Sequence, residues 1–128
     1  MVAVFIPVSV GELFDKISIL EIKRDNITQA SKAKHILHEY NKLLKVIKKI
    51  EPNFQKKRLY INLKKCNAAL WEIEEAKRLH EKNKDFGKKF IQWSRLVYIR
   101  NDQRAKIKFA INKYYNSDIV EIKSYKKY

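Results

Sequence analysis

Apolar residues recur at steps of three and four along most of the chain, which is the period of a helix buried on one face. The segments that carry this pattern lie at about 10–25, 31–50, 54–81 and 86–115. Ser9 and Glu12 fit a capping box at the start of the first segment, and Pro52 follows the end of the second. The pattern predicts an all-α fold, an antiparallel helical bundle of about four main helices.

The segments outside these helices are short. Residues 1–8 are apolar and β-branched, so we expect an extended amino-terminal segment that covers the helices. Residues 119–128 form a short carboxy-terminal tail, in which Ile119, Ile122 and Tyr125 recur at steps of three and predict a last turn packed back on the bundle. No repeat or linker divides the chain, so we expect residues 1–128 to form a single helical domain.

The second and third segments have similar lengths and a short connection. These features predict that the two helices form an antiparallel hairpin. A long hairpin of this kind often pairs across a two-fold axis, so we expect a homodimer.

The first predicted helix is apolar on two sides, because Leu13 and Ile17 share one stripe whereas Ile22 lies opposite. A helix that is apolar on two sides is packed on two sides, so we expect it near the centre of the bundle. Its polar residues are then informative, because Glu21 lies within the main apolar stripe and Asp15 lies on the opposite apolar side.

The fourth segment has a polar interruption in its apolar stripe. The spacing that places Val97 inward reaches Asn101 and Arg104 before the stripe resumes at Ile107. We expect this helix to continue unbroken through the interruption, with both polar side chains facing inward.

A buried guanidinium needs a carboxylate partner, because an unpaired buried charge is strongly destabilising. Glu21 is our first choice of partner for Arg104 and Asp15 is the second, while Asp102 lies beside Arg104 on the same helix. Two interpretations stay open at this point. The cluster is either a polar pocket at the bundle centre or a structural ion pair that fixes helix register.

Other polar groups have ordinary structural explanations. Glu74 and Arg78 fit a helix-surface pair better than the alternative, one wall of a ligand site with Trp71 and Glu75. Cys66 fits a buried inert thiol. The three histidines and the single cysteine assemble no zinc spacing, so we expect no metal and no cofactor. The common enzyme motifs are also missing, which is weak evidence against catalysis.

The net charge is +15, from 29 basic and 14 acidic residues, and such an excess favours a polyanionic partner. Most of the basic residues are lysines, however, and the chain is also rich in Ile and Asn and poor in Gly and Ala, as in proteins from A+T-rich genomes. Nucleic-acid binding is therefore the weaker alternative. No apolar run reaches the roughly 20 residues that cross a bilayer, and the start of the chain lacks a signal peptide, so we expect a soluble cytoplasmic protein.

The segment Val8–Lys23, VSVGELFDKISILEIK, resembles the signature VSxGELxDKxxILEIK of a small bacterial family of uncharacterised helical proteins. Asn67–Glu74 (NAALWEIE), Phe90–Ala105 (FIQWSRLVYIRNDQRA) and Glu121–Tyr125 (EIKSY) are similar to its later blocks, with departures at Trp93-Ser94 and at Ile122. The resemblance spans nearly the whole chain. It implies an association with glycosyltransferases of surface-polysaccharide assembly, beside which or fused to which such domains occur.

The motif positions of this family coincide with the inward polar residues found from helical phase, and together they define a candidate site. Its residues are Asp15, Lys16, Glu21, Tyr98, Asn101, Asp102, Arg104, Lys123, Ser124 and Tyr125. Carboxylates, cations and hydroxyls around one cleft suit a polar ligand such as a sugar or a nucleotide sugar. We expect a non-catalytic accessory or ligand-binding module that works with a glycosyltransferase partner. The alternative is a small enzyme that acts on a sugar or a phosphorylated substrate, with Asp15 or Asp102 as acid or base.

Overall fold

The computed structural model describes all 128 residues and contains helices and no strands. The helices are α1 (Val10–Asn26), α2 (Ala30–Ile50), the single 3-10 turn η1 (Phe54–Lys56), α3 (Arg58–Lys82) and α4 (Lys88–Tyr114). The prediction of an all-α bundle of four main helices is confirmed. The fourth helix runs unbroken through its polar interruption, as its spacing indicates.

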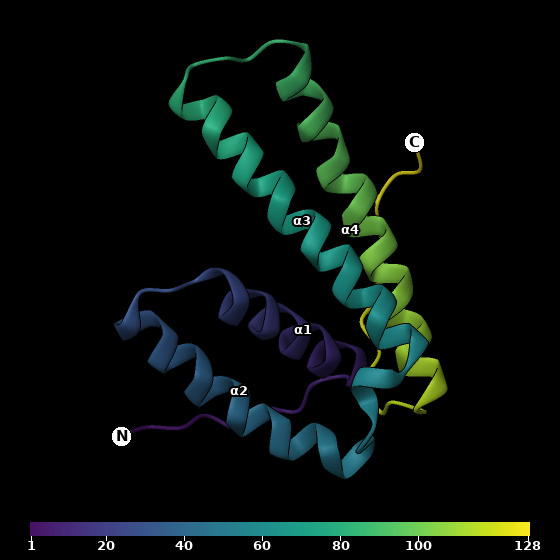
Figure 1. Ribbon diagram of the computed structural model, residues 1–128. Helices are drawn as coiled ribbons and strands as arrows, with labels where there is room; N and C mark the ends of the chain where they lie inside the picture. Colours follow the sequence, from purple (N-terminus) through teal and green to yellow (C-terminus); the bar gives the residue numbers. More distant parts are fainter.

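The helices form two hairpins that meet at one end (Figure 1). α1 packs against α2, α3 packs against α4, and α1 also lies against both α3 and α4. The predicted hairpin between the second and third helices is wrong, because α2 and α3 diverge from their connection (Figure 1). The expectation of a homodimer rested on that hairpin and loses its basis.

The connection between α2 and α3 explains this divergence. Phe54 in η1 is buried, and its ring makes edge contacts with Phe14, at 6.4 Å between ring centroids, and with Tyr60, at 5.0 Å. An aromatic side chain anchored in this way fixes the connection beneath α1. The chain therefore leaves for α3 in a new direction instead of folding back along α2.

The hydrophobic core surrounds α1. Leu13, Phe14, Ile17 and Leu20 on one side of this helix are buried, and Ile22 on the other side is buried as well. Helix α1 contacts each of the other three main helices. The expectation of a central first helix packed on two sides is confirmed.

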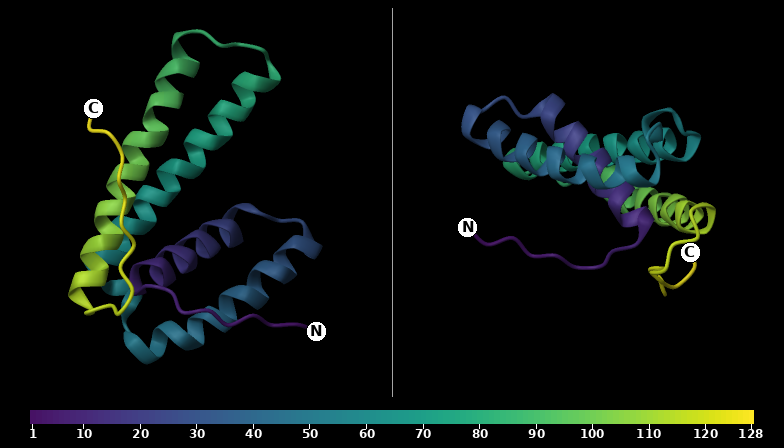
Figure 2. Two further views of the ribbon diagram at one scale, coloured as in Figure 1. Left: turned by 180° about the vertical axis from the view of Figure 1, so that it is seen from behind. Right: turned by 90° about the horizontal axis from the view of Figure 1, so that it is seen from below.

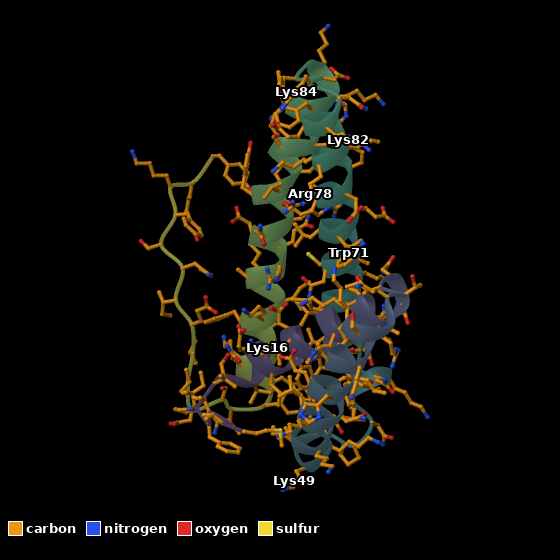
Figure 3. All side chains as sticks on the ribbon, turned by 90° about the vertical axis from the view of Figure 1, so that its left-hand side faces the viewer. Lys16, Lys49, Trp71, Arg78, Lys82 and Lys84 are labelled. Atoms are coloured by element: carbon orange, nitrogen blue, oxygen red, sulfur yellow. The ribbon has the colours of Figure 1, made fainter.

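The far end of the α3–α4 hairpin extends beyond α1 and has little core. Arg78, Lys82 and Lys84 lie on this extension (Figure 3). Within α4, the fully buried residues are Ile111 and Asn112, both near its C-terminal end. The packed part of the molecule is thus the end at which the two hairpins meet.

The two ends of the chain are both extended. Residues 1–8 are exposed, with Phe5 91% exposed, and they leave the body instead of covering it (Figure 2). The cover expected there is wrong, because residues 1–8 are all exposed and none of them packs against the hydrophobic core. The tail forms no helical turn. Residues 119–128, here called the C-terminal strap, run back along α4 as an extended segment (Figure 2).

None of the helices combines the length and the apolar character needed to cross a bilayer.

Candidate functional site

A cleft of about 550 Å³ lies between α4 and the C-terminal strap, with the first turn of α1 at its base. Figure 3 shows the strap running alongside α4. We call this space the α4–strap cleft. It is lined by Glu12, Val97, Tyr98, Asn101, Asp102, Arg104, Ala105, Lys108, Glu121, Lys123 and Tyr125.

Arg104 is the central cation of the cleft, and its partner is Asp15 on α1. Its Nε donates to Oδ1 of Asp15 at 2.9 Å and its Nη2 donates to Oδ2 at 2.5 Å, a two-bond ion pair. Its Nη1 donates to Asn101 Oδ1 at 3.3 Å. The inward polar cluster is confirmed, whereas Glu21 as first choice of partner is wrong and Asp15 as second choice is correct. The hydrogen bonds to Asp15 are the main reason that the pKa of Arg104 lies above its ordinary value.

Asp15 is 1% exposed, so its charge needs the full complement of donors that surrounds it. Asn67 of α3 donates from Nδ2 to Asp15 Oδ1 at 2.8 Å. Ser18 donates to the backbone carbonyl of Asp15 and accepts from Asn67, both at 2.8 Å. The carboxylate is therefore held from α3 and α4 together, behind Arg104 and outside the lining of the cleft.

Lys108 lies one turn beyond Arg104 on α4 and is surrounded by carboxylates. Its Nζ is 2.7 Å from Oε2 of Glu12, 3.3 Å from Oε2 of Glu121 and 3.8 Å from Oδ2 of Asp15. Its side chain is only 12% exposed. This ammonium group joins α1, α4 and the strap, and it closes the base of the cleft.

The first turn of α1 is fixed by hydrogen bonds to the end of α4 and to the turn that follows it. Val10 N–H donates to Ser117 Oγ at 3.1 Å and Gly11 N–H donates to Asn112 Oδ1 at 2.6 Å. A Cβ on Gly11 would lie 2.6 Å from the carbonyl oxygen of Lys108, so only glycine permits this approach. Helix α1 therefore has a fixed height against α4, which places Asp15 opposite Arg104.

The capping box at the start of α1 forms only in part. Glu12 N–H donates to Ser9 Oγ at 3.0 Å, as predicted. The Glu12 carboxylate instead pairs with Lys108, and this pairing makes it part of the cleft. The predicted return of that carboxylate to the cap amide is wrong, because the buried ammonium is a stronger partner than a single amide.

The strap contributes a charged pair and an aromatic ring to the cleft. Lys123 Nζ is 2.6 Å from Glu121 Oε1, and this bond together with Lys108 lowers the pKa of Glu121. The ring of Tyr128 contacts that of Tyr98 on α4, with 5.0 Å between centroids. The strap is thus tied to α4 by charges near its start and by aromatic packing at its end.

The structure brings six of the ten sequence-predicted site residues to the lining of this cleft, namely Tyr98, Asn101, Asp102, Arg104, Lys123 and Tyr125. Asp15 supports the cleft from behind. Lys16 is exposed and lies 3.9 Å from Glu12 Oε1, away from the lining, and Ser124 is exposed on the strap.

Glu21 belongs to a different cluster, between α1, α2 and α3. Its carboxylate accepts from Tyr40 Oη and Gln55 Nε2, both at 2.7 Å, from Lys64 Nζ at 3.1 Å and from Tyr60 Oη in a very short bond. Burial raises the pKa of Glu21, but these four hydrogen bonds outweigh it and the net pKa is lowered. The expectation that Glu21 and Arg104 meet in one site is wrong, because they lie on opposite sides of α1.

Glu12, Lys108 and Glu121 are the charged cleft residues that sequence reasoning missed. Lys108 follows Arg104 by four residues and so shares its face of α4, a spacing that was visible in the sequence. Glu12 had already been assigned to the helix cap. Glu121 lies in an extended segment, where no periodicity marks it.

The remaining candidates are Cys66 and the group of Glu74 and Arg78, which lines a pocket with Trp71 between α1 and α3. Burial raises the pKa of the Cys66 thiol, consistent with an inert buried side chain. Glu74 pairs with Lys77, at 4.0 Å, and not with Arg78 as predicted. Steps of three and of four residues both reach the same side of a helix, so the sequence alone does not distinguish Lys77 from Arg78 as the partner.

The fold and the cleft define an all-α protein whose long helix and C-terminal strap enclose a charged cavity. Residues 4–128 match the model of a family of unknown function, DUF6165, and the chain belongs to this family. The match covers nearly the whole chain, and the family has no assigned function. No curated protein and no solved structure matches the chain.

Proposed function

We propose that the protein is a non-catalytic module that binds a sugar or a nucleotide sugar in the α4–strap cleft. The observation that carries this proposal is the cleft itself, a cavity of about 550 Å³ in which cations, carboxylates, an amide and two tyrosines face one space. This volume lies within the range of about 300–1,000 Å³ that is usual for small-molecule sites.

The lining suits the two chemical characters of a sugar. Asn101 and Asp102 offer acceptors and donors for hydroxyl groups along one face of α4. The rings of Tyr98 and Tyr125 are exposed at the cleft and offer flat apolar surfaces for the C–H face of a pyranose. A site with both kinds of group binds a polyhydroxylated ring better than it binds a purely apolar or purely ionic molecule.

Lys123 is the cation best placed to receive a diphosphate. Its side chain is 45% exposed, and its only carboxylate partner, Glu121, is also exposed, so this pair is weak and exchangeable. Lys108, in contrast, is held among three carboxylates. A nucleotide sugar would therefore direct its diphosphate toward the strap and its sugar toward Asn101 and Arg104.

Two observations favour binding over catalysis. Asp15, one of the two residues considered as an acid or base, is buried behind Arg104 and does not face the cleft. The pKa of Glu121 is lowered by Lys123, which keeps this carboxylate ionised and unsuited to act as a general acid at neutral pH. The alternative of a small enzyme therefore depends on Asp102, which does line the cleft.

We further propose that this module serves surface-polysaccharide assembly with a glycosyltransferase as partner. The support for this step is the resemblance carried by Val8–Lys23 and the later blocks. The same blocks supply Asn101, Asp102 and Arg104 on α4 and Lys123 on the strap, all of which line the cleft.

A panel of nucleotide sugars tests binding and catalysis together. We expect at least one member to raise the melting temperature saturably while its NMR spectrum shows no turnover. The variant Lys123→Gln should lose most of this shift, whereas Lys45→Gln on the exposed face of α2 should retain it. Turnover that is abolished in Asp102→Asn would establish the enzyme alternative, and no shift with any sugar or nucleotide sugar would contradict the proposal.

A further inference from the structure

A second groove, also of about 550 Å³, lies between α3 and α4, and we call it the α3–α4 groove. Asn62, Lys65 and Cys66 line it from α3, and Arg100, Gln103 and Lys106 line it from α4. These α4 residues are offset from Asn101, Arg104 and Lys108, so the groove and the α4–strap cleft occupy different faces of the same helix.

The charge of this groove differs from that of the cleft. Lys65, Arg100 and Lys106 all line it, and no carboxylate does. None of these three cations makes an ion pair elsewhere in the chain. In the cleft, Arg104, Lys108 and Lys123 each face a carboxylate. Three uncompensated cations around one concavity attract an anion that carries more than one charge.

Arg100 supplies a second and independent observation. Its Nη1 donates to Gln103 Oε1 at 3.0 Å, but its Nε is buried and has no hydrogen-bond acceptor. A buried donor without a partner is rare in folded proteins, and an anion oxygen in the groove is an acceptor that would satisfy it. The guanidinium can turn toward such an acceptor at low cost, because the bond that would break is the exposed one to Gln103.

We infer that the α3–α4 groove binds the phosphoryl group of a small molecule. The planar fork of Arg100 matches two oxygens of a phosphate, and the ammonium groups of Lys65 and Lys106 add point charges on either side. The side-chain amides of Asn62 and Gln103 complete a set of donors along the groove. A terminal phosphate or a diphosphate, with two or more charges in one place, fits three clustered cations better than singly charged phosphodiesters spread along a strand do. This site is independent of the proposed sugar-binding function.

Calorimetric titration with inorganic pyrophosphate at about 50 mM salt, where charge screening is moderate, tests the inference. We expect saturable binding to the native protein. The double variant Lys65→Gln/Lys106→Gln should bind at least about tenfold more weakly, since it removes two charged donors. The control Lys42→Gln/Lys45→Gln makes the same change of charge on exposed positions of α2 and should bind as the native protein does.

Arg100→Lys provides the second test, because it keeps the charge and removes the planar fork with its Nε–H. We expect it to weaken pyrophosphate binding while the helical circular-dichroism spectrum stays unchanged. The inference would be overturned if Lys65→Gln/Lys106→Gln bound pyrophosphate as tightly as the native protein does. It would also be overturned if this double variant and the α2 control lost binding equally. Loss of pyrophosphate binding in Lys123→Gln alone would also overturn it, while placing the anion in the α4–strap cleft. Binding of single-stranded RNA or duplex DNA without binding of pyrophosphate would replace it with a nucleic-acid surface.

Discussion

Helix α1 buries two carboxylates, Asp15 and Glu21, each 1% exposed, and the two are compensated in different ways. Asp15 faces charged partners, namely the guanidinium of Arg104, which binds it in a bidentate manner, and the more distant ammonium of Lys108. Glu21 is surrounded mainly by neutral donors, two tyrosine hydroxyls and a glutamine amide, with a single lysine at the edge. One helix thus carries an ion pair on one side and a hydrogen-bond network on the other.

The difference separates a site from a scaffold. Arg104 keeps 29% of its side chain exposed and lines the cleft, so its bond to Asp15 orients a cation that a ligand can reach. The Tyr40 and Tyr60 side chains are buried, and their hydroxyls end at Glu21, which joins α1, α2 and α3. The Arg104–Asp15 pair therefore both stabilises the fold and presents a cation to the cleft. The hydrogen bonds to Glu21 only stabilise the fold.

Removing the partner of Asp15 should cause the largest loss in the free energy of unfolding. Arg104→Met leaves a buried carboxylate without its guanidinium, and we expect a loss of about 3–5 kcal/mol, toward the lower end because Lys108 remains nearby. The double variant Arg104→Met/Asp15→Leu should recover most of that loss, since two apolar groups often replace a buried ion pair at little cost. Urea unfolding of the native protein, the single variant and the double variant measures both quantities. A double variant no more stable than the single one would mean that the pair is not energetically separable from its surroundings.

The Glu21 side should respond to loss of a single neutral donor. Tyr60→Phe removes one of four hydrogen bonds to a buried carboxylate, and we expect a loss of about 1.5–3 kcal/mol. Tyr114→Phe, at an exposed tyrosine, serves as the control and should leave the free energy of unfolding unchanged. Ligand binding in the cleft should be the same in both variants. Impaired binding in Tyr60→Phe would contradict the separation of site and scaffold.

Gly11 tests the contact between α1 and α4 that positions Asp15. In Gly11→Ala the new Cβ would meet the Lys108 carbonyl at 2.6 Å and Asn112 Oδ1 at 2.9 Å, so we expect a loss of about 1–3 kcal/mol from overpacking. Gly87→Ala is the matched control, because its nearest contact is 3.4 Å and its φ is −76°. Ligand binding should fall in the first variant and not in the second. Equal stability of the two variants would show that α1 and α4 can separate at this point without cost.

We expect the smallest changes in the free energy of unfolding from the titration of Glu21 and Tyr40 with pH. The pKa of Glu21 is lowered by folding, so its stabilisation is present above its ordinary value of about 4.5 and is lost as the pH falls through the lower folded value. Burial and the bond to Glu21 raise the pKa of Tyr40 to about 12, so that its stabilisation is present below 10.0 and is lost as the pH rises toward 12. Urea unfolding between about pH 9 and pH 12 should show a shallower loss in Tyr40→Phe than in the native protein. Identical slopes would exclude this role of the Tyr40 hydroxyl.

Helical periodicity located the four main helices to within a few residues, because each has an apolar stripe along its length. It did not reveal how the helices pair. Pairing depends on the connection that carries Phe54, whose burial beneath Phe14 turns α3 away from α2, and a single aromatic residue in a short connection carries no period. The exposed amino-terminal segment was missed for a related reason, since apolar composition does not say what a segment contacts.

The same reasoning found part of the candidate site. Phase placed Asn101 and Arg104 inward because both continue the stripe of a long unbroken helix. It chose the wrong carboxylate because phase separates the two sides of α1 but does not say which side packs against α4. Lys123 and Tyr125 lie in an extended strap and came only from the resemblance. Lys108 is distinguished from the other lysines by its three carboxylate neighbours, which come from α1 and the strap and share no sequence pattern with it.

The most direct test of ligand binding in the α4–strap cleft is a crystal structure of the protein with the nucleotide sugar that raises its melting temperature most. We predict that the sugar lies in the α4–strap cleft, in contact with Asn101, Arg104 and Tyr125, with the diphosphate at Lys123 and the Arg104–Asp15 pair intact. A ligand bound at the Glu21 cluster, or on any surface outside the cleft, would contradict it.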